Sequence, residues 1–455
     1  MRKSRAALVS AAAGIAMVAL AACSSGSPAS SNSESAPGAA TAEGSASSAA
    51  ASSPAAGEPT TISLWHMQTD QPEVIDTALA RFQTANPNVT LDVSATAGDA
   101  IKDKLKVALG ANDAPCIFPT WGGGPLASYV DAGQVLDLTP YMDADGYKDR
   151  FVPAALSNVT LEDKIYGVPV ENSDVAVIFY SKPIFEKYGL TPPTTWSEFT
   201  TVVDTLIENG VAPIALANKD KWTGAMWYDY LVERLGGSEG FKSAALRTGG
   251  AFTDPAFVRA GEIIQELVDQ GAFAKGFNGL EWGTGGSRKL LYSGKAAMEL
   301  MGGWNYGIFL GDGKADEFGF FPFPTVDGGT GDPSAILGNI GGNFYSISST
   351  CADPDTAFEV IKYLIDDDSV AERIAAGRVP PVKGIELSDP NTAALFDLIQ
   401  NASSVQLWWD QYMPSEFAQL HLNEVQSLFG GSATPEEVAQ AQEELATTLL
   451  GPTKS

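Results

Sequence analysis

The sequence predicts an α/β protein built from mostly parallel sheets whose faces are covered by helices. Short apolar segments alternate with longer amphipathic ones in the first part of the folded region, as in strands joined by helical crossovers. The chain has 455 residues, enough for two domains, and 46 glycines. Ligands of such sheets bind beyond the carboxyl ends of the strands, so residues at those ends are the first site candidates.

The first expected elements place three candidate residues at strand ends. Trp65 and His66 close one strand, and Trp121 follows another. The expected strands are 61–65, 89–93 and 116–118, and the expected helices are 73–85, 100–109 and 125–132.

A strand interrupted by a proline comes next. It covers 165–171, and the extended pattern resumes at 175–180, with Glu171 and Asn172 at the break. This arrangement fits either a crossing between two lobes or a simple edge strand. Further helices are expected at 182–188, 195–209, 222–235, 254–269, 357–365, 415–428 and from 434 onward, and further extended segments at 318–323 and 341–347.

The segment from Gly294 to Trp304 has the form of a cleft edge. A short buried strand at 296–300 is followed by Gly302 and Gly303, and Trp304 then begins a helix. The missing side chains let the backbone turn and another group approach closely. Trp304 is therefore a candidate for ligand contact, although a core tryptophan behind a glycine turn would give the same pattern.

The N-terminus has the form of an export signal. Three basic residues precede the uncharged apolar run 6–22, which ends at Cys23 in a sequence that resembles a bacterial lipobox. The expectation is a signal peptide at 1–22 and a lipid-modified Cys23 that anchors the protein. A secreted protein cut nearby is the alternative. Residues 24–59 are mostly Ser, Ala, Gly, Pro and Thr, which predicts a disordered tether over 23–59.

Charge and composition exclude several classes of partner. The formal net charge is −27, so nucleic acid is not expected to bind, and the membrane is expected to be reached only through the lipid. With His66 and His421 as the only histidines, a histidine-based metal site is not expected. Cys116 and Cys351 are a possible disulfide pair, and the sequence leaves open whether they meet.

No catalytic or cofactor motif is present. The sequence contains no Gly-x-Ser-x-Gly elbow, no His-Glu-x-x-His motif and no phosphate or dinucleotide loop, so neither a catalytic residue nor a cofactor is assigned. A carboxylate pair for glycoside hydrolysis stays open, because acidic residues are frequent and their separation in space is not visible in the sequence.

Tryptophans with polar neighbours carry the functional signal. The apolar faces of sugar rings stack on indoles, and sugar hydroxyls need polar side chains as hydrogen-bond partners. The candidate tryptophans are Trp65, Trp121, Trp222, Trp227, Trp282, Trp304, Trp408 and Trp409. The other candidates are His66, Gln68, Asp70, Glu171, Asn172, Tyr228, Asn343 and Asp410, with Arg288 and Gln411 close by.

These motifs resemble those of the family 1 extracellular solute-binding proteins, the receptors of ATP-driven sugar importers, especially actinobacterial lipoproteins that bind xylobiose and related short oligosaccharides. The resemblance covers about 59–449. Its motifs, in order, are Trp121 to Leu126, Ala132 to Thr139, Tyr166 to Pro169, Phe179 to Lys182, Pro193 to Phe199, Gly294 to Trp304, Phe321 to Pro324 and Trp409 to Gln411.

The resemblance implies a periplasmic-binding-protein-like fold of the maltodextrin-binding type, with two hinged lobes at 60–170 plus 321–349 and at 171–320 plus 350–455. It places sugar contacts at Trp121, Glu171, Trp227, Tyr228, Trp304, Trp408 and Trp409. It implies a monomer on the extracellular face of the cell membrane that delivers sugar to the membrane permease subunits of an ABC importer. Many relatives carry an aspartate in place of Cys116, so the resemblance assigns that position no role. The alternatives are a cell-surface glycosidase and a receptor of the same fold for a non-sugar solute such as a polyamine.

Overall fold

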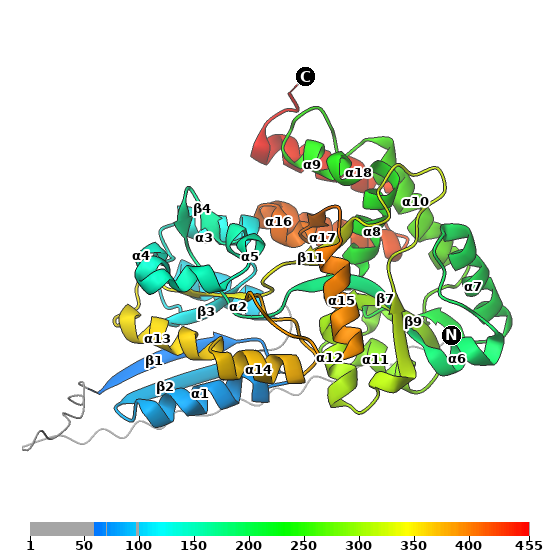
Figure 1. Ribbon diagram of the computed structural model, residues 1–455. Helices are drawn as coiled ribbons and strands as arrows, with labels where there is room; N and C mark the ends of the chain where they lie inside the picture. Colours follow the sequence, from blue (N-terminus) through cyan, green and yellow to red (C-terminus); the bar gives the residue numbers. More distant parts are fainter. Residues whose placement is uncertain (1–58, 70, 97–99, 455) are drawn as a thin grey trace, which may run out of the picture. The chain divides into compact units, whose positions relative to one another are not determined.

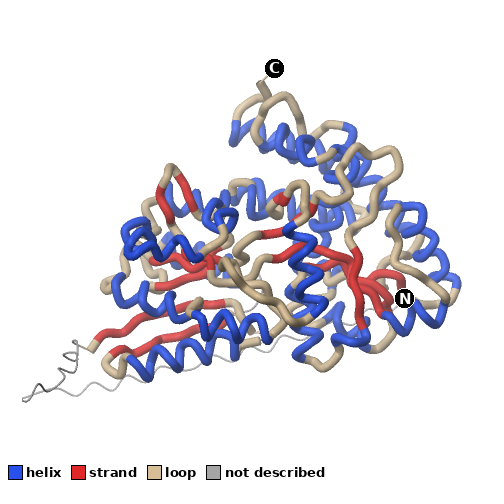
Figure 2. Tube along the Cα trace, in the orientation of Figure 1, coloured by secondary structure: helices blue, strands red, loops and turns tan. Residues whose placement is uncertain are grey.

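The computed structural model describes residues 59–69, 71–96 and 100–454. Signal peptide, Cys23 and almost all of the tether, together with Asp70, therefore lie outside the described residues. Figure 1 labels the elements along the chain, and Figure 2 shows helices and strands in the same orientation. Within the described ranges, no helix combines the length and the apolar composition that a membrane crossing requires.

The first lobe is organised around a five-stranded sheet with the order β2-β1-β3-β12-β6. β1 is parallel to β2 and β3, whereas β12 is antiparallel to β3 and β6. Its strands are β1 (Thr60–His66), β2 (Val89–Ala95), β3 (Ile117–Thr120), β6 (Val168–Pro169) and β12 (Phe344–Ile347), and β4 (Thr160–Leu161) and β5 (Lys164–Ile165) form a separate pair. Its helices are α1 (Glu73–Ala85), α2 (Ala100–Gly110), α3 (Gly123–Asp131), α4 (Thr139–Asp143), η1 (Ala144–Arg150), α5 (Pro153–Ser157), α13 (Pro354–Leu364) and α14 (Asp367–Ala375).

The second lobe contains a six-stranded sheet, with the order β13-β11-β7-β9-β8 and β10 paired to β7. Its strands are β7 (Asp174–Ser181), β8 (Ala212–Ile214), β9 (Ala296–Gly302), β10 (Phe318–Phe321), β11 (Ile336–Asn339) and β13 (Val405–Gln406). The helices up to β11 are α6 (Lys182–Tyr188), α7 (Trp196–Glu208), η2 (Asn218–Asp220), α8 (Trp222–Gly236), α9 (Ser238–Ala245), α10 (Pro255–Asp269), η3 (Phe277–Gly279), α11 (Gly286–Tyr292), α12 (Trp304–Gly311) and η4 (Ala315–Glu317). The later helices are α15 (Pro390–Gln400), α16 (Trp409–Tyr412), α17 (Ser415–Phe429) and α18 (Pro435–Leu450).

Both sheets are mixed, which differs from the mostly parallel sheets that the sequence predicts. β7 is antiparallel to β9, β10 and β11. β7 and β12 enter their sheets directly from the other lobe, without a helical crossover, and a strand that enters this way can run against its neighbours. The helix-joined pairs β1–β2, β1–β3 and β8–β9 are parallel, as expected.

The chain passes between the lobes three times, at 170–173, 340–343 and 376–389. The first crossing lies at the predicted break around Glu171. The later lobe boundaries differ from the expected ones: β11 belongs to the second sheet, and α13 and α14 pack on the first lobe. Phe358, Ile361 and Leu364 of α13 are in the same hydrophobic core as the first sheet, and Figure 1 shows α13 and α14 near α1. A helix after a strand returns to that strand's own sheet, and β12 has already re-entered the first lobe.

A disulfide between Cys116 and Cys351 fastens the middle of the first sheet. Cys116 directly precedes β3 and Cys351 follows β12, with Cα atoms 4.7 Å apart at a sequence separation of 235. β3 and β12 are antiparallel neighbours, so the start of one lies beside the end of the other. The bridge therefore ties a strand of the N-terminal segment to the strand that returns from the second lobe.

Candidate functional site

A cavity lies between the two sheets, and all three crossings contribute to its wall. It contains about 1250 Å³ of empty space, part of it open to solvent. The residues that line it are Met67, Gln68, Thr69, Lys102, Trp121, Glu171, Asn172, Asp174, Asp220, Trp222, Ala225, Met226, Asp229, Trp282, Gly283, Trp304, Ile308, Asn339, Gly342, Asn343, Arg378, Trp408, Asp410 and Gln411. Because the crossings are part of the wall, a ligand in the cavity would contact both lobes and the connections between them.

Four tryptophans of the second lobe form a continuous wall of this cavity. The ring centroids of Trp222 and Trp282 are 5.5 Å apart, and Trp304 lies 6.1 Å from Trp222 and 6.4 Å from Trp282. Trp408 extends the wall at 6.2 Å from Trp304. The rings meet edge to face, the arrangement that aromatic quadrupoles favour, so adjacent indoles present differently tilted apolar surfaces.

The position of Trp304 follows from the glycine turn that precedes it. β9 is buried along its whole length, and α12 begins at Trp304. A Cβ atom on Gly302 would lie only 2.1 Å from the Trp304 ring, so only glycine lets the indole fold back over the strand end. This is the close approach that the sequence predicts for the Gly302–Gly303 turn.

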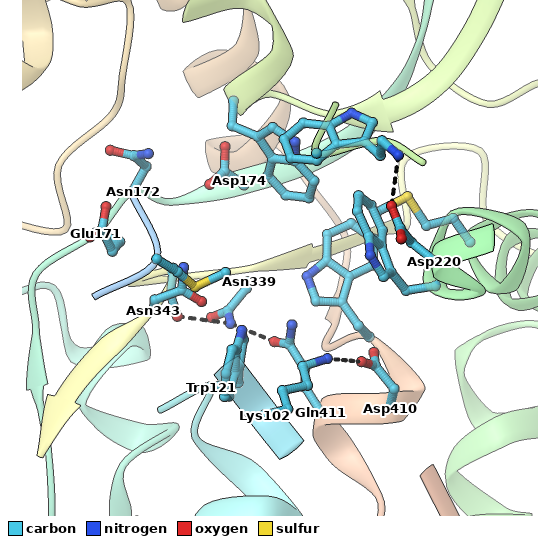
Figure 3. Close-up of a pocket in the computed structure, with 18 of the residues that line it drawn as sticks. Lys102, Trp121, Glu171, Asn172, Asp174, Asp220, Asn339, Asn343, Asp410 and Gln411 are labelled. Carbon is cyan, nitrogen blue, oxygen red and sulfur yellow. Dashed lines mark hydrogen bonds and ion pairs between the residues drawn. The ribbon is translucent and has the colours of Figure 1, made fainter. Parts of the chain in front are cut away.

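The opposite side of the cavity combines Trp121 with polar contacts, one of which joins the two lobes. Trp121 follows β3, and the Lys102 ammonium lies 5.0 Å from the centroid of its ring. Lys102 Nζ also donates to Asp410 Oδ2 of the second lobe at 3.1 Å. Asn339 Nδ2 donates to Gln411 Oε1 at 2.8 Å, and Figure 3 shows Trp121, Lys102, Gln411 and Asp410 together on this side.

Glu171, on the first crossing, is held by two arginines. Its Oε2 accepts from Arg373 Nη1 at 3.0 Å and from Arg378 Nη1 at 3.5 Å, and all three side chains are buried. Arg378 Nε also donates to Gln71 Oε1 at 2.7 Å, and Gln71 Nε2 donates to the Gly307 carbonyl of the second lobe at 2.9 Å. The Glu171 carboxylate is therefore fixed in place at the hinge before any ligand arrives.

Asp174 lies at the start of β7, close to the first turn of α12. Burial raises the pKa of its carboxyl to about 7, although Arg378 and the backbone N–H of Trp304 favour the ionised form. Asn172 lines the cavity nearby, and its buried Oδ1 has no hydrogen-bond partner among the described residues. Figure 3 shows Glu171, Asn172 and Asp174 in the same part of the cavity wall.

Two further carboxylates fix backbone atoms beside the tryptophan wall. Asp220 Oδ2 accepts from the backbone N–H of Trp282 at 2.7 Å. Asp229 Oδ2 accepts from the backbone N–H of Trp409 at 3.4 Å, and Asp229 Oδ1 lies 3.1 Å from His421 Nε2. Burial raises the pKa of Asp229, and its contact with His421 opposes that shift.

The cavity brings together most of the residues that the sequence singles out. Those that line it are Gln68, Trp121, Glu171, Asn172, Trp222, Trp282, Trp304, Asn343, Trp408 and Asp410. Those that the structure places elsewhere are Trp65, His66, Trp227, Tyr228 and Trp409.

The aromatic candidates that lie outside the cavity have two different environments. Trp227, Tyr228 and Trp409 are almost completely buried in the core of the second lobe, where Trp409 stacks on Phe241 with centroids 4.1 Å apart. Trp65 packs against the first lobe with Lys104 Nζ 3.7 Å from its ring centroid.

His66 is only 3% exposed, and its burial lowers the pKa of the imidazole. A buried imidazole that loses affinity for protons is a poor candidate for binding through a charged form.

Several residues that line the cavity were not predicted from the sequence. For one helix, the spacing of its residues could have indicated some of them. Trp222, Ala225, Met226 and Asp229 all line the cavity from α8. Their spacing of three, four and seven residues marks one face of a helix, from which Trp227 is turned away. The other missed polar residues, Lys102, Asp174, Asn339 and Arg378, have no distinctive local pattern and meet only through the fold.

A family comparison identifies the chain. Residues 68–371, more than half of the chain, match the model of the family described as bacterial extracellular solute-binding protein. The chain belongs to this family. The matched residues begin just after β1 and end within α14, and they include Trp121, Glu171 and Trp304 of the cavity wall.

Among solved structures, this solute-binding protein is similar to a chain from work on xylan utilization by the thermophilic bacterium Caldanaerobius polysaccharolyticus. The two chains are 33% identical with a TM-score of 0.79, and the match covers 85% of this chain and 99% of the other. A chitin oligosaccharide binding protein is 26% identical with a TM-score of 0.79, over 86% of this chain and 99% of its own.

Among curated proteins, an ABC transporter extracellular-binding protein of Pyrococcus horikoshii is 27% identical over 270 residues. That alignment covers 57% of this chain and 59% of the relative, so this solute-binding protein spans less than two thirds of that relative.

Proposed function

We propose that the protein is the substrate-binding component of an ABC importer and captures a short oligosaccharide in the cavity between its lobes. The observation that carries this proposal is the wall of four tryptophans opposite Trp121 in a cavity edged with amides and carboxylates. Stacked indoles suit the C–H faces of sugar rings, and Asn172, Asn343 and Gln68 suit their hydroxyls.

The length of this wall supports more than one sugar ring. Trp222, Trp282 and Trp304 are in mutual edge-to-face contact, and Trp408 adds a fourth ring 6.2 Å from Trp304. A monosaccharide would cover only part of that surface. The names of two similar solved proteins, one from work on xylan utilization and one that binds chitin oligosaccharides, agree with an oligosaccharide ligand.

We propose Trp304, Trp121 and Glu171, which the sequence singles out and which line the cavity, as ligand-binding residues. Trp304 and Trp121 supply stacking surfaces, and Glu171, held by two arginines, accepts from a sugar hydroxyl at the hinge. The protein acts as a monomeric receptor rather than as an enzyme. Sugar is therefore released unchanged to the membrane permease subunits of the importer.

We also propose that the receptor is anchored outside the cell by lipid on Cys23. A charged N-terminus, an apolar run and a cysteine at its end support this, and the following segment to about residue 59 would serve as a tether. Metabolic labelling with a radioactive fatty acid should label the wild-type protein. A Cys23→Ser variant should take up no label, and equal label in both proteins would contradict the anchor.

Calorimetry with a panel of sugars tests the function. Xylobiose, xylotriose, N,N′-diacetylchitobiose and maltose should be compared, with spermidine as the non-sugar ligand. We expect at least one oligosaccharide to bind with micromolar or tighter affinity and to be recovered intact after long incubation. Binding of spermidine alone would favour a polyamine receptor, and cleaved sugar would favour a glycosidase.

A further inference from the structure

Trp408 and Trp409 are neighbours in sequence, but their side chains lie in different environments. Trp408 lines the cavity as the fourth ring of the tryptophan wall, whereas Trp409 is 1% exposed and packs in the core of the second lobe. The backbone is non-helical at Trp408, with φ −44° and ψ 136°, and α16 begins at Trp409. The direction of the Trp408 indole therefore depends on how the start of this short helix is held.

The start of α16 receives a hydrogen-bond acceptor from another helix. A helix leaves its first backbone N–H groups without partners inside the helix, and the indole of Trp408 at the N-cap position cannot accept a hydrogen bond. Asp229 of α8 supplies the acceptor, because its Oδ2 accepts from the backbone N–H of Trp409 at 3.4 Å. On the other side of Trp408, β13 is paired with β11. Trp408 thus lies between two fixed points of the backbone.

Asp229 is itself held by two side chains of the core. Its Oδ1 lies 3.1 Å from His421 Nε2 of α17, and His421 Nδ1 lies 3.2 Å from Gln442 Nε2 of α18. An amide nitrogen only donates, so Nδ1 accepts from Gln442 and the ring proton of His421 lies on Nε2, facing Asp229. Asp229 is 3% exposed, and His421 and Gln442 are fully buried. Three helices therefore fix the position of this carboxylate.

We propose that His421 and Gln442 are positioning residues for sugar binding: through Asp229 they fix the start of α16 and so hold the Trp408 indole in the cavity wall. This proposal rests on the proposed function and assigns how one surface of the same site is kept in place. Neither His421 nor Gln442 is among the described residues that line the cavity, so a change at either one reaches the ligand only through its neighbours. Asp229 does line the cavity, and its variants would combine direct and indirect effects.

A double-mutant cycle tests whether His421 acts through Trp408. The probe is whichever of xylobiose, xylotriose, N,N′-diacetylchitobiose and maltose binds the wild-type protein most tightly, measured by calorimetry. We expect Trp408→Ala to weaken binding about tenfold, as the loss of a stacked indole does, and His421→Leu to weaken it about threefold or more. In the Trp408→Ala background, His421→Leu should change the affinity less than about twofold, because the indole that His421 positions is already absent.

Two further variants separate positioning from a loss of stability. His421→Gln keeps a donor that can face Asp229, so its affinity should stay within about twofold of wild type. Val425→Ala removes two methyl groups from a fully buried position one turn further along α17 and destabilises the same helix. Its affinity should also stay within about twofold, with and without Trp408. If His421→Leu does not fold, Gln442→Met replaces it in the cycle under the same criteria, because it keeps the side-chain length and removes the donor to His421.

Several outcomes would overturn the proposal while the proposed function stands. These are an affinity that His421→Leu leaves unchanged, a loss of equal size with and without Trp408, and a loss that Val425→Ala reproduces. Unchanged affinity in Trp408→Ala would also overturn it, because the indole would then bind no sugar. If none of the four sugars binds the wild-type protein, the proposed function fails, and this proposal fails with it.

Discussion

Trp304 is the residue on which most of the candidate site depends, because it contacts the three other tryptophans of the wall and the end of β9. Replacing it with alanine removes the centre of the aromatic wall. We expect Trp304→Ala to weaken binding of the best sugar at least about tenfold, because a stacked indole contributes ~1–3 kcal/mol. Calorimetry measures the loss.

The matched control is Trp65→Ala, which removes an indole that packs on the first lobe outside the cavity. Its sugar affinity should stay within about twofold of wild type. If Trp304→Ala binds as tightly as wild type, or if both variants lose affinity equally, the tryptophan wall does not bind the sugar.

The raised pKa of Asp174 predicts how the stability of the protein depends on pH. Its pKa in the folded protein, about 7, lies well above the ordinary value of an aspartate carboxyl, with burial as the main cause and with Arg378, Glu171 and the Trp304 N–H as its neighbours. A raised carboxyl pKa means that the folded state binds the proton more tightly. This carboxyl therefore contributes stability below about pH 4 that is lost as the pH rises through about 7.

We therefore expect Asp174→Asn to gain stability relative to wild type between pH 4 and pH 8, by at least about 1 kcal/mol, since one pKa unit corresponds to ~1.4 kcal/mol. Urea unfolding at both pH values measures the difference. Glu299, whose pKa burial also raises to about 7, remains in both proteins and does not affect the comparison. A constant difference at the two pH values would contradict the assigned pKa.

Of the candidate residues near strand ends, Trp121 and Trp304 line the cavity, whereas Trp65 and His66 at the end of β1 do not. Trp121 and Trp304 were found because a strand end fixes where the next residue lies. Every residue of α8 from Thr223 to Arg234 is buried, so composition could not tell its cavity face from its core face. Trp408 precedes α16 with a non-helical backbone and lines the cavity, whereas Trp409 is the first residue of α16 and enters the core.

At the scale of elements, the disulfide makes the clearest prediction. It joins residues next to β3 and β12, and neither cysteine lines the cavity. Replacing both Cys116 and Cys351 by serine should lower the free energy of unfolding by ~2–5 kcal/mol, because the unfolded chain regains the freedom of a long loop. Sugar affinity should change less than twofold. A variant that is as stable as wild type would show that the bridge adds nothing to the fold.

The contact of α3 with the loop after α16 tests how the lobes meet. A Cβ atom on Gly124 would lie 2.3 Å from the Met413 carbonyl oxygen of the second lobe. Gly124→Ala should therefore push the lobes apart at this contact and weaken sugar binding about fivefold or more, as calorimetry can show. Gly110→Ala is the matched control, because its Cβ would meet no atom within 4 Å and should leave affinity unchanged. Equal affinity in the two variants would exclude a role for this contact in binding.

Element prediction was accurate for long periodic segments and inaccurate for lobe assignment. The helices at 73–85 and 100–109 and the strand at 61–65 lie within one residue of their predicted bounds. The lobe to which β11 and α13 belong depends on strand pairing and packing between segments far apart in the chain, which local periodicity does not contain. Of the three crossings described above, only the one at the broken strand around Glu171 has a recognisable pattern in the local sequence.

For the whole molecule, we expect a bound ligand to bring the two lobes closer together. Lys102 with Asp410, and Gln71 with Gly307, connect the lobes beside the cavity, and a ligand in contact with both would favour the arrangement that makes these bonds. We expect a smaller radius of gyration with bound sugar, measured by small-angle scattering on the Cys23→Ser protein. A non-binding sugar is the control. If the radius of gyration is unchanged when sugar is bound, the lobes do not close on the ligand.

Because β12 returns to the middle of the first sheet, the order of synthesis limits when this sheet can be completed. The ribosome delivers β1, β2 and β3 early, but the strand that belongs between β3 and β6 comes only after nearly the whole second sheet. Until β12 is available, the edges of β3 and β6 that it pairs with have no neighbouring strand. Cys116 can pair with Cys351 only after a further 235 residues have been synthesised. Biogenesis therefore cannot finish one lobe and then start the other; the N-terminal third of the chain must be kept from wrong partners until most of the remainder has emerged.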